Sequence, residues 1–284
     1  MTAPPGAVLI TGASSGIGLA CSRLLALRGF RVFAASRTFS AQQESEEPRT
    51  DQIVPIALDV TSDHSIADAI AKVRSELSTA PLAGLVNCAG GSLPGPLEHI
   101  DRAALNRLFD LNVTGQLALI QAALPMLRSS RGRIVNVGST SGRIPGALNG
   151  AYSASKAALE TLTSVLRAEL ARSGIGVSMI VPGVVATAFW DKVAASEAAL
   201  TGKLEEAGVL SYGRALARRQ ALFAKLRSSG RPAEDVCNAI LHALCSPNPQ
   251  RRYVVGADAR LKLAVWAVLP ERIRDHLLEG SIDR

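Results

Sequence analysis

The chain has 284 residues, of which 48% are hydrophobic and 4% aromatic, and its formal net charge is +7. Its length suits one α/β domain with a single core, and its longest apolar runs fall far short of the roughly 20 residues that a membrane span needs. The basic residues are spread along the chain and aromatic side chains are scarce, which argues against a nucleic-acid-binding surface.

The cysteines indicate the cellular compartment. Cys21, Cys88, Cys237 and Cys245 stand far apart, without the C-x-x-C spacing of metal or redox sites. We interpret them as reduced thiols and expect no metal site. An apolar run begins by about Ala7 and leaves no room for a signal peptide before it. A cytoplasmic location is therefore expected.

The stretch from Ala7 to Gly29 predicts a strand, a glycine-rich turn and a helix. Glycines in the turn would let the backbone approach a pyrophosphate, and the positive end of the helix would attract the same anion. The candidate phosphate-binding residues are Gly12, Ser14, Ser15, Gly16, Ile17 and Gly18. For this motif alone, a connection that needs small residues and binds nothing is the alternative.

The end of the second predicted strand, residues 31–36, indicates the cofactor. A carboxylate there would hydrogen-bond a ribose 2′-hydroxyl and repel a 2′-phosphate. The chain instead has Ser36 and Arg37. Because Arg37 can form charge-assisted bonds to a phosphate, NADP(H) is favoured over NAD(H). The alternative is a surface arginine that binds nothing.

The elements that follow alternate between strand and helix. A polar surface loop is expected at residues 38–51, and strands are predicted at residues 53–60, 85–87, 133–137, 176–181 and 253–256. Helices are predicted at residues 62–77, 101–109, 112–127, 152–172, 232–245, 261–269 and 273–278. This order predicts an α/β fold with a doubly wound parallel sheet and helices on both faces. Ligands of such sheets bind where the strands end, here near Gly12, Arg37, Asp59, Asn87, Ser139 and Pro182.

Six motifs occur in one order along the chain. They are Thr11-Gly12-x-x-x-Gly16-x-Gly18, Asn87-Cys88-Ala89-Gly90, Asn112, Ser139, Tyr152-x-x-x-Lys156 and Pro182-Gly183. With this set the chain resembles the short-chain dehydrogenase/reductase family over about residues 7–187, and the final strand region extends the match. The resemblance implies one Rossmann-type domain over residues 1–284 and a nicotinamide-dependent dehydrogenase activity.

Tyr152 and Lys156 are the central catalytic candidates. Residues four apart share a helix face, so a lysine ammonium beside the phenol, together with a positive nicotinamide, would lower the pKa of Tyr152. The phenol could then exchange a proton with a carbonyl or alcohol oxygen near neutral pH. A half-buried tyrosine beside a solvated lysine is the alternative for this pair alone.

Ser139 and Asn112 complete the catalytic set. The hydroxyl of Ser139, at the end of the fifth predicted strand, would hold the substrate oxygen and stabilise developing charge. Gly138 precedes it where the family often has a second serine, and Ser141 is a rival with the wrong spacing to Tyr152. The resemblance implies that Asn112 supports a water linking the lysine to solvent, and that Lys156 also binds the nicotinamide ribose.

The resemblance implies further cofactor contacts. Backbone at Asn87, Ala89 and Gly90 would lie near the adenosine ribose, and Asp59 with Val60 would receive the adenine ring. After the sixth strand come Pro182 and Gly183, followed by Val185 and Thr187, which match positions that hold the nicotinamide carboxamide. Thr187 could equally cap the helix that follows.

The segment 188–230 resembles the variable lid that forms the substrate pocket in the family. Its aliphatic and aromatic residues, including Phe189 and Trp190, predict an apolar pocket, although many must simply pack the lid on the core. Its basic face is interpreted as solvated and comprises Arg214, Arg218, Arg219, Lys225, Arg227 and Arg231. Residues 257–284 are expected as terminal amphipathic helices that pack on the lid, cover a dimer interface or lie peripherally on a membrane.

The sequence thus predicts an NADP(H)-dependent oxidoreductase that transfers a hydride between the nicotinamide and a carbonyl or secondary alcohol. The terminal helices resemble those of members that act on steroids and retinoids, so a bulky lipophilic substrate is expected. A reductase of acidic lipids or acyl thioesters is one alternative, and a cofactor-sensing regulatory protein on the same fold is another. An epimerase or dehydratase is disfavoured because those enzymes usually carry a different glycine spacing and a longer substrate domain, both of which this chain lacks. A homodimer or homotetramer is expected.

Overall fold

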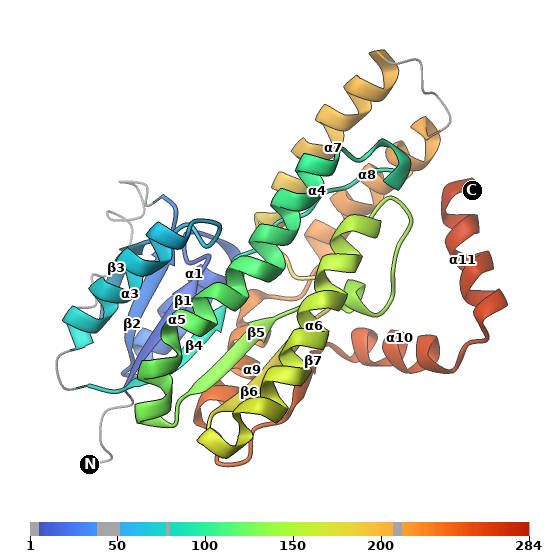
Figure 1. Ribbon diagram of the computed structural model, residues 1–284. Helices are drawn as coiled ribbons and strands as arrows, with labels where there is room; N and C mark the ends of the chain where they lie inside the picture. Colours follow the sequence, from blue (N-terminus) through green and yellow to red (C-terminus); the bar gives the residue numbers. More distant parts are fainter. Residues whose placement is uncertain (1–5, 39–51, 78–79, 207–211, 284) are drawn as a thin grey trace.

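The computed structural model describes residues 6–38, 52–77, 80–206 and 212–283 (Figure 1). Within them, seven parallel strands form one sheet in the order β3-β2-β1-β4-β5-β6-β7. The strands are β1 (Ala7–Thr11), β2 (Arg31–Ser36), β3 (Ile53–Ala57), β4 (Leu82–Asn87), β5 (Arg133–Val137), β6 (Gly176–Pro182) and β7 (Arg252–Val255). The order reverses between β1 and β4, which creates the crevice where ligands of doubly wound sheets bind. The expected α/β fold is confirmed.

Three predicted strand bounds need correction. β3 ends at Ala57 rather than residue 60, because Ala57 pairs with Ser36, the last residue of β2. β4 begins at Leu82 rather than residue 85, because its first residues pair with β1 across a register shift. β7 runs over residues 252–255, and Gly256, with φ of 113°, turns the chain into the next helix. Strand ends therefore depend on partner strands that the local pattern does not reveal. Residues 39–51 of the expected surface loop lie outside the described residues.

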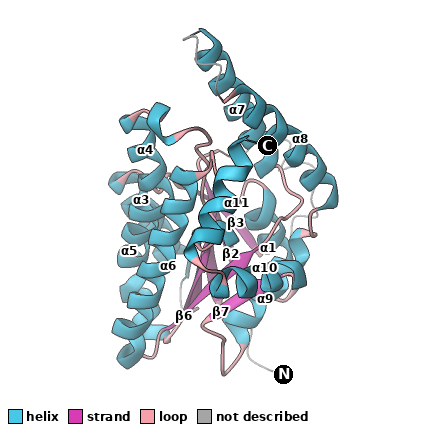
Figure 2. Ribbon diagram, turned by 90° about the vertical axis from the view of Figure 1, so that its right-hand side faces the viewer, coloured by secondary structure: helices cyan, strands magenta, loops and turns pink. Residues whose placement is uncertain are grey.

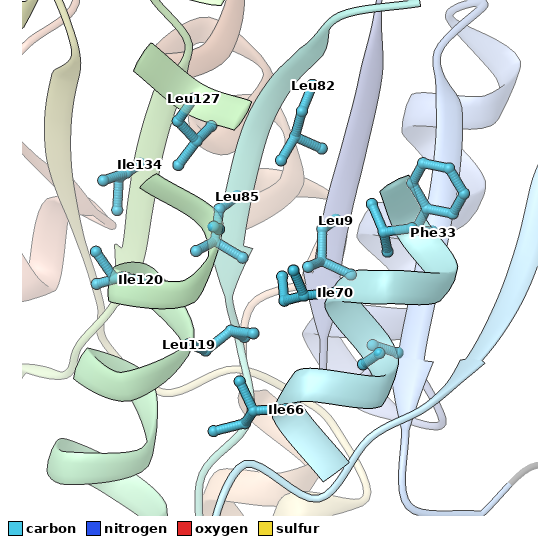
Figure 3. Packing of buried hydrophobic residues seen from close by; sticks show 14 of the residues in the cluster. Leu9, Phe33, Ile66, Ile70, Leu82, Leu85, Leu119, Ile120, Leu127 and Ile134 are labelled. Carbon is cyan, nitrogen blue, oxygen red and sulfur yellow. The ribbon is translucent and has the colours of Figure 1, made fainter. Parts of the chain in front are cut away.

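Helices cover both faces of the sheet (Figure 2). On one face lie α3 (Asp63–Leu77), α5 (Gly115–Ser130) and α6 (Gly150–Leu170), whereas α1 (Gly16–Leu27) and α9 (Ala233–Cys245) pack on each other and on the opposite face. Figure 3 shows Leu9, Leu85 and Ile134 of the sheet meeting side chains of α3 and α5 such as Ile70, Leu119 and Ile120. Each fully buried aliphatic side chain of this kind contributes about 2 kcal/mol. This packing fixes the strand ends that carry the site.

The chain between β4 and β5 positions one predicted site residue. A short helix, η1 (Leu97–His99), precedes α4 (Arg102–Phe109), whose first turn is capped by the Asp101 carboxylate accepting from the Ala104 N–H at 2.9 Å. A single π-helical turn, η2 (Asp110–Thr114), then connects α4 to α5 and contains Asn112. The predicted helix 112–127 therefore begins inside this turn, and α6 begins at Gly150 rather than residue 152.

The segment 188–230 forms two long helices, α7 (Phe189–Glu206) and α8 (Gly213–Ser229), which pack on each other and rise from one end of the sheet (Figure 1). Residues 207–211 of the expected lid lie outside the described residues. After β7 follow α10 (Ala257–Val268) and α11 (Glu271–Asp283), and α11 touches α8. Among the described residues, the helices are all too short or too polar to cross a bilayer.

Candidate functional site

A cavity of about 480 Å³ opens where β1, β2, β4, β5 and β6 end. Nineteen of the predicted site residues line it: Gly12, Ser14, Ser15, Gly16, Ile17, Gly18, Ser36, Arg37, Asp59, Val60, Ala89, Gly90, Ser139, Tyr152, Lys156, Pro182, Gly183, Val185 and Thr187. Asn87 and Asn112 do not line it. The glycine turn and the Tyr152–Lys156 pair, about 140 residues apart in sequence, therefore meet in one cavity.

The glycine turn lies tightly against the loop after β4. Gly12 has φ of 67°, and a Cβ there would stand 2.9 Å from the Ala89 nitrogen. A Cβ at Gly18 would stand 2.3 Å from the Gly12 oxygen, so the turn requires glycine at both positions. The Thr11 hydroxyl accepts hydrogen bonds from the N–H groups of Cys88 and Ala89, both at 3.0 Å.

The start of α1 fits a phosphate group. Its cap residue Ser15 makes no side-chain capping bond, so the first N–H groups of the helix face the cavity without such a partner. Backbone without Cβ atoms, free helical N–H groups and a neighbouring hydroxyl, that of Ser14, form a cradle suited to a pyrophosphate. Thr187, at the start of the segment before α7, lies over Gly16, with 3.4 Å between its Cβ and a Cβ built on that glycine.

Arg37 and Asp59 lie at the far end of the cavity. Arg37 is exposed, and the Asp59 carboxylate accepts from the N–H of Thr61 at 2.9 Å and from its hydroxyl at 2.7 Å. The Thr61 N–H bond, the Thr61 hydroxyl and nearby Arg37 hold the pKa of Asp59 below its usual value. Asp59 is therefore ionised, and its carboxylate is hydrogen-bonded to Thr61. The Ser36 hydroxyl, at the end of β2, donates to the Thr38 carbonyl at 2.8 Å.

Tyr152 and Lys156 share a face of α6, as predicted. The fall in the pKa of the phenol is expected with a positive nicotinamide bound beside it and stays a prediction, because the structure describes the free protein. Burial raises the pKa of Tyr152 to about 12, and the hydrogen bond with Ser139 acts in the opposite direction. The Lys156 ammonium lies 5.8 Å from the centre of the phenol ring and donates to the Val137 carbonyl at 3.0 Å. Burial lowers its own pKa to about 8. At neutral pH the phenol is therefore protonated.

Ser139 rather than Ser141 lies beside the phenol. Ser139 caps η3 (Thr140–Gly142), where its hydroxyl oxygen accepts the Ser141 N–H at 3.1 Å. At Gly138, a Cβ would stand 2.4 Å from the Met179 methyl group, so a serine there would require that side chain to move. The glycine at this position therefore matches the packing beneath it.

Asn112 hydrogen-bonds the backbone of the loop after β4 and does not line the cavity. Its Oδ1 accepts from the Gly91 N–H at 2.8 Å, and its Nδ2 donates to the Gly91 carbonyl and to the Ser155 hydroxyl, both at 3.0 Å. A Cβ at Gly90 would stand 3.2 Å from Asn112 Oδ1 and 3.5 Å from Lys156 Nζ. Asn112 therefore holds the backbone that lies next to the lysine.

The side chain of Asn87 lies in the core, and the expected contact of its backbone with a ribose stays a prediction. It is fully buried, and its Nδ2 donates to Asn136 Oδ1 at 2.9 Å. Asn136 in turn donates to the Thr163 hydroxyl at 2.9 Å. This chain of bonds ties β4, β5 and α6 together beneath the site, which the sequence could not reveal because its members lie far apart.

Aromatic side chains from α7 cover the phenol. The rings of Phe189 and Tyr152 lie 6.0 Å apart, and those of Phe189 and Trp190 lie 5.6 Å apart. Trp190 donates from its indole nitrogen to the Val185 carbonyl at 2.8 Å, which fixes the ring. Together with Ile144 these residues give the cavity an apolar wall next to Tyr152.

Sequence reasoning missed Asn149 and misjudged Arg219. Both line the cavity. Arg219 was expected on a solvated face, but its side chain is 12% exposed and forms an ion pair with Glu197, which is fully buried. The position of Asn149, three residues before Tyr152, was the available signal. For Arg219 the sequence gave no such signal, because a run of charges on one helix is typical of a solvated face.

Comparison with known proteins agrees with this geometry. The family model described as short chain dehydrogenase matches residues 6–198. The chain is 35% identical over 254 residues to 3-amino-tetrahydro-pyrrolizinone reductase of Xenorhabdus hominickii, covering 89% of this chain and 87% of that protein. It is 33% identical over 280 residues to human (Homo sapiens) retinol dehydrogenase 16, covering 95% and 87%.

A solved structure supports the same assignment. The crystal structure of a short-chain dehydrogenase from Streptomyces avermitilis superimposes with a TM-score of 0.75 at 28% identity, covering 98% of this chain and 97% of that one. The relatives and the solved structure thus match nearly the whole chain, and the family model matches residues 6–198. The chain belongs to the short-chain dehydrogenase/reductase family.

Proposed function

We propose that this oxidoreductase uses NADP(H) to transfer a hydride to or from the carbonyl or secondary alcohol group of a bulky lipophilic substrate. The observation that carries the proposal is the meeting of Ser139, Tyr152 and Lys156 with the glycine turn in one cavity. A regulatory protein that only senses the cofactor would have no use for a protonated phenol beside a serine hydroxyl.

The cofactor and each of the three catalytic residues have a distinct role in the proposed reaction. When bound, the nicotinamide supplies or accepts the hydride. Tyr152 donates its proton to the carbonyl oxygen during reduction and takes it back during alcohol oxidation. Ser139 donates a hydrogen bond to the same oxygen and stabilises the charge that develops there. Lys156 supplies a positive charge beside the phenolate that forms, which lowers the cost of proton release.

The cavity lining supports a nicotinamide dinucleotide. Backbone from Gly12 to Gly18 would hold the pyrophosphate, and Asp59 with Val60 would receive the adenine. Ala89 and Gly90 would lie along the ribose, and Val185 with Thr187 would hold the carboxamide. These residues form a continuous path from Arg37 to Tyr152.

NADP(H) is favoured because of Arg37. Its guanidinium is exposed at the end of β2, where it can bind a 2′-phosphate. A neighbouring carboxylate, that of Asp59, accepts two hydrogen bonds from Thr61. NAD(H) is therefore the less suited cofactor.

The substrate part of the cavity favours a lipophilic ketone or alcohol. Phe189, Trp190, Val193 and Ile144 line it, and the segment 188–230 would serve as the lid. The similarity to retinol dehydrogenase 16 supports such a substrate. Among the described residues all four cysteines are free, which suits the reducing cytoplasm.

We also propose a homodimer or homotetramer formed through α5 and α6. Val165 on α6 is 47% exposed, and Leu117 on α5 and both Leu162 and Leu166 on α6 are half-buried. These side chains exceed what the core-facing stripe requires. Sedimentation at micromolar concentration tests this, and a monomer alone would contradict it.

The proposed activity is tested by following NADPH oxidation with ketones of increasing size, from acetone through cyclohexanone to 1-tetralone. We expect turnover whose kcat/KM rises with apolar size. Tight NADPH binding without turnover of any ketone or acyl thioester would favour the sensor, and a maximum for acyl thioesters would favour that alternative substrate class.

A further inference from the structure

The turn just before α6 contains a strained residue. Leu148 has φ of 58°, a left-handed conformation that a side chain with a Cβ disfavours. Its side chain packs against Ala215 and Leu216 of α8, and its carbonyl accepts from the Gly95 N–H at 2.8 Å. Strain of this kind persists only where the surroundings impose it, and it concentrates at functional sites. The turn lies one helical turn before Tyr152.

Arg219 of α8 binds the residues on both sides of Leu148. Its Nη1 donates to the Ala147 carbonyl at 3.0 Å, and its Nη2 donates to Asn149 Oδ1 at 3.2 Å. Its Nε donates to Glu197 of α7. One guanidinium therefore connects α7, α8 and the turn before α6.

The partner of Arg219 explains why a charge is tolerated there. Glu197 is fully buried, and burial raises its pKa while the guanidinium opposes that rise. The buried ion pair is costly to break, because removing either partner would leave an uncompensated buried charge. Glu197 and Arg219 thus hold the turn in a fixed position relative to both helices.

The contact with Arg219 also orients the Asn149 carboxamide. A guanidinium carries only donors, so the Asn149 oxygen must face it and the Nδ2 amino group must face away. Within the described chain, Nδ2 donates no hydrogen bond to protein. Asn149 lines the cavity together with Tyr152, so this donor is available to a ligand.

We propose that Asn149 binds a second oxygen atom of the substrate and that Glu197 and Arg219 position it for this purpose. The proposal rests on the reductase function and refines its substrate class. The substrate is a lipophilic carbonyl compound, or the matching alcohol, that carries a further acceptor oxygen such as an ether or hydroxyl. Since residues three apart in a helix lie about 4.5 Å apart along its axis, that oxygen is on the order of 5 Å from the reacting carbonyl.

Matched ligand pairs test the proposal without turnover. Calorimetry on the enzyme with NADP⁺ gives the Kd of 5-, 6- and 7-methoxy-1-tetralone and of the corresponding ethyl-1-tetralones, which replace the ether oxygen by CH₂. We expect at least one methoxy compound to bind about tenfold more tightly than its ethyl partner, the effect of one hydrogen bond in a buried pocket. Equal affinities within every pair would overturn the proposal.

Two variants assign the preference to these residues. Asn149→Asp keeps an oxygen for Arg219 but has no donor, so the methoxy preference should fall to about onefold while the affinity for the ethyl partners stays unchanged. Arg219→Lys loses the fork that orients Asn149 and should lose the same preference. Arg218→Lys, a matched change at the exposed neighbour of Arg219, should keep it. An unchanged preference in Asn149→Asp would overturn the assignment.

Turnover of unsubstituted 1-tetralone with NADPH separates this proposal from the reductase function. Absence of turnover alongside an Asn149-dependent binding preference would overturn the reductase function and support the Asn149 site. Turnover without such a preference would support the reductase function and overturn the Asn149 site.

Discussion

The Lys156 ammonium donates a hydrogen bond to the main-chain carbonyl of Val137 at 3.0 Å, within the buried end of the cavity. This contact holds the lysine at the carboxyl end of β5, next to the phenol one helical turn earlier. A single carbonyl does not replace the water that the ammonium loses, so burial lowers the pKa of Lys156 to about 8. The catalytic arrangement therefore costs stability in the free protein.

The first prediction concerns the pH dependence of stability. Because the pKa of Lys156 is about 8 in the folded state and about 10.4 in the unfolded state, the unfolded chain binds more protons between these values. The free energy of unfolding of the wild type should rise by about 2 kcal/mol relative to Lys156→Met from pH 7.5 to 9.5. Urea unfolding of both proteins at both pH values measures this. A difference in unfolding free energy between wild type and Lys156→Met that does not change with pH would refute the lowered pKa of Lys156.

The second prediction concerns cofactor choice. Arg37→Asp replaces an attraction to the 2′-phosphate by a repulsion, so the Kd for NADPH should rise by about a hundredfold and the Kd for NADH by less than threefold. Arg28→Asp makes the same charge change at an exposed position outside the cavity and serves as the control. Fluorescence titration gives both constants. Equal loss for the two cofactors, or equal wild-type affinity for them, would contradict the role of Arg37.

The third prediction concerns the aromatic wall. Trp190→Ala removes apolar surface beside Tyr152, so kcat/KM should fall about tenfold for 1-tetralone and less than threefold for acetone, at roughly 25 cal/mol per Å² of lost burial. Trp190→Phe, which keeps a ring but loses the bond to Val185, should retain most of the activity on 1-tetralone. An equal loss on both ketones in Trp190→Ala would show that the ring only supports the fold.

The local geometry of the site could be predicted from sequence because it depends on residues that lie close together along the chain. The glycine turn requires Gly12 and Gly18 for steric reasons, and a four-residue spacing places Tyr152 and Lys156 on one helix face. The alternation of strands and helices likewise predicts the parallel sheet with helices on both faces.

Features that depend on distant partners could not be predicted. Glu197 and Arg219 are 22 residues apart on different helices, and in the sequence the arginine belongs to a charge run that is typical of a solvated face. The bond from Asn87 to Asn136 spans 49 residues. The pKa of Tyr152 in the free protein is another example, because burial, which spacing does not specify, raises it against the hydrogen bond with Ser139.

The central claim, that Tyr152 is the proton donor of an NADPH-dependent carbonyl reduction, is tested most directly by Tyr152→Phe. The variant keeps the ring that packs on Phe189 and lacks only the hydroxyl. We measure kcat for 1-tetralone together with the Kd for NADPH. We expect kcat to fall by about a hundredfold or more, the usual contribution of a positioned acid, with the Kd within about twofold of the wild type. A variant that keeps more than about a tenth of the wild-type kcat would contradict the account.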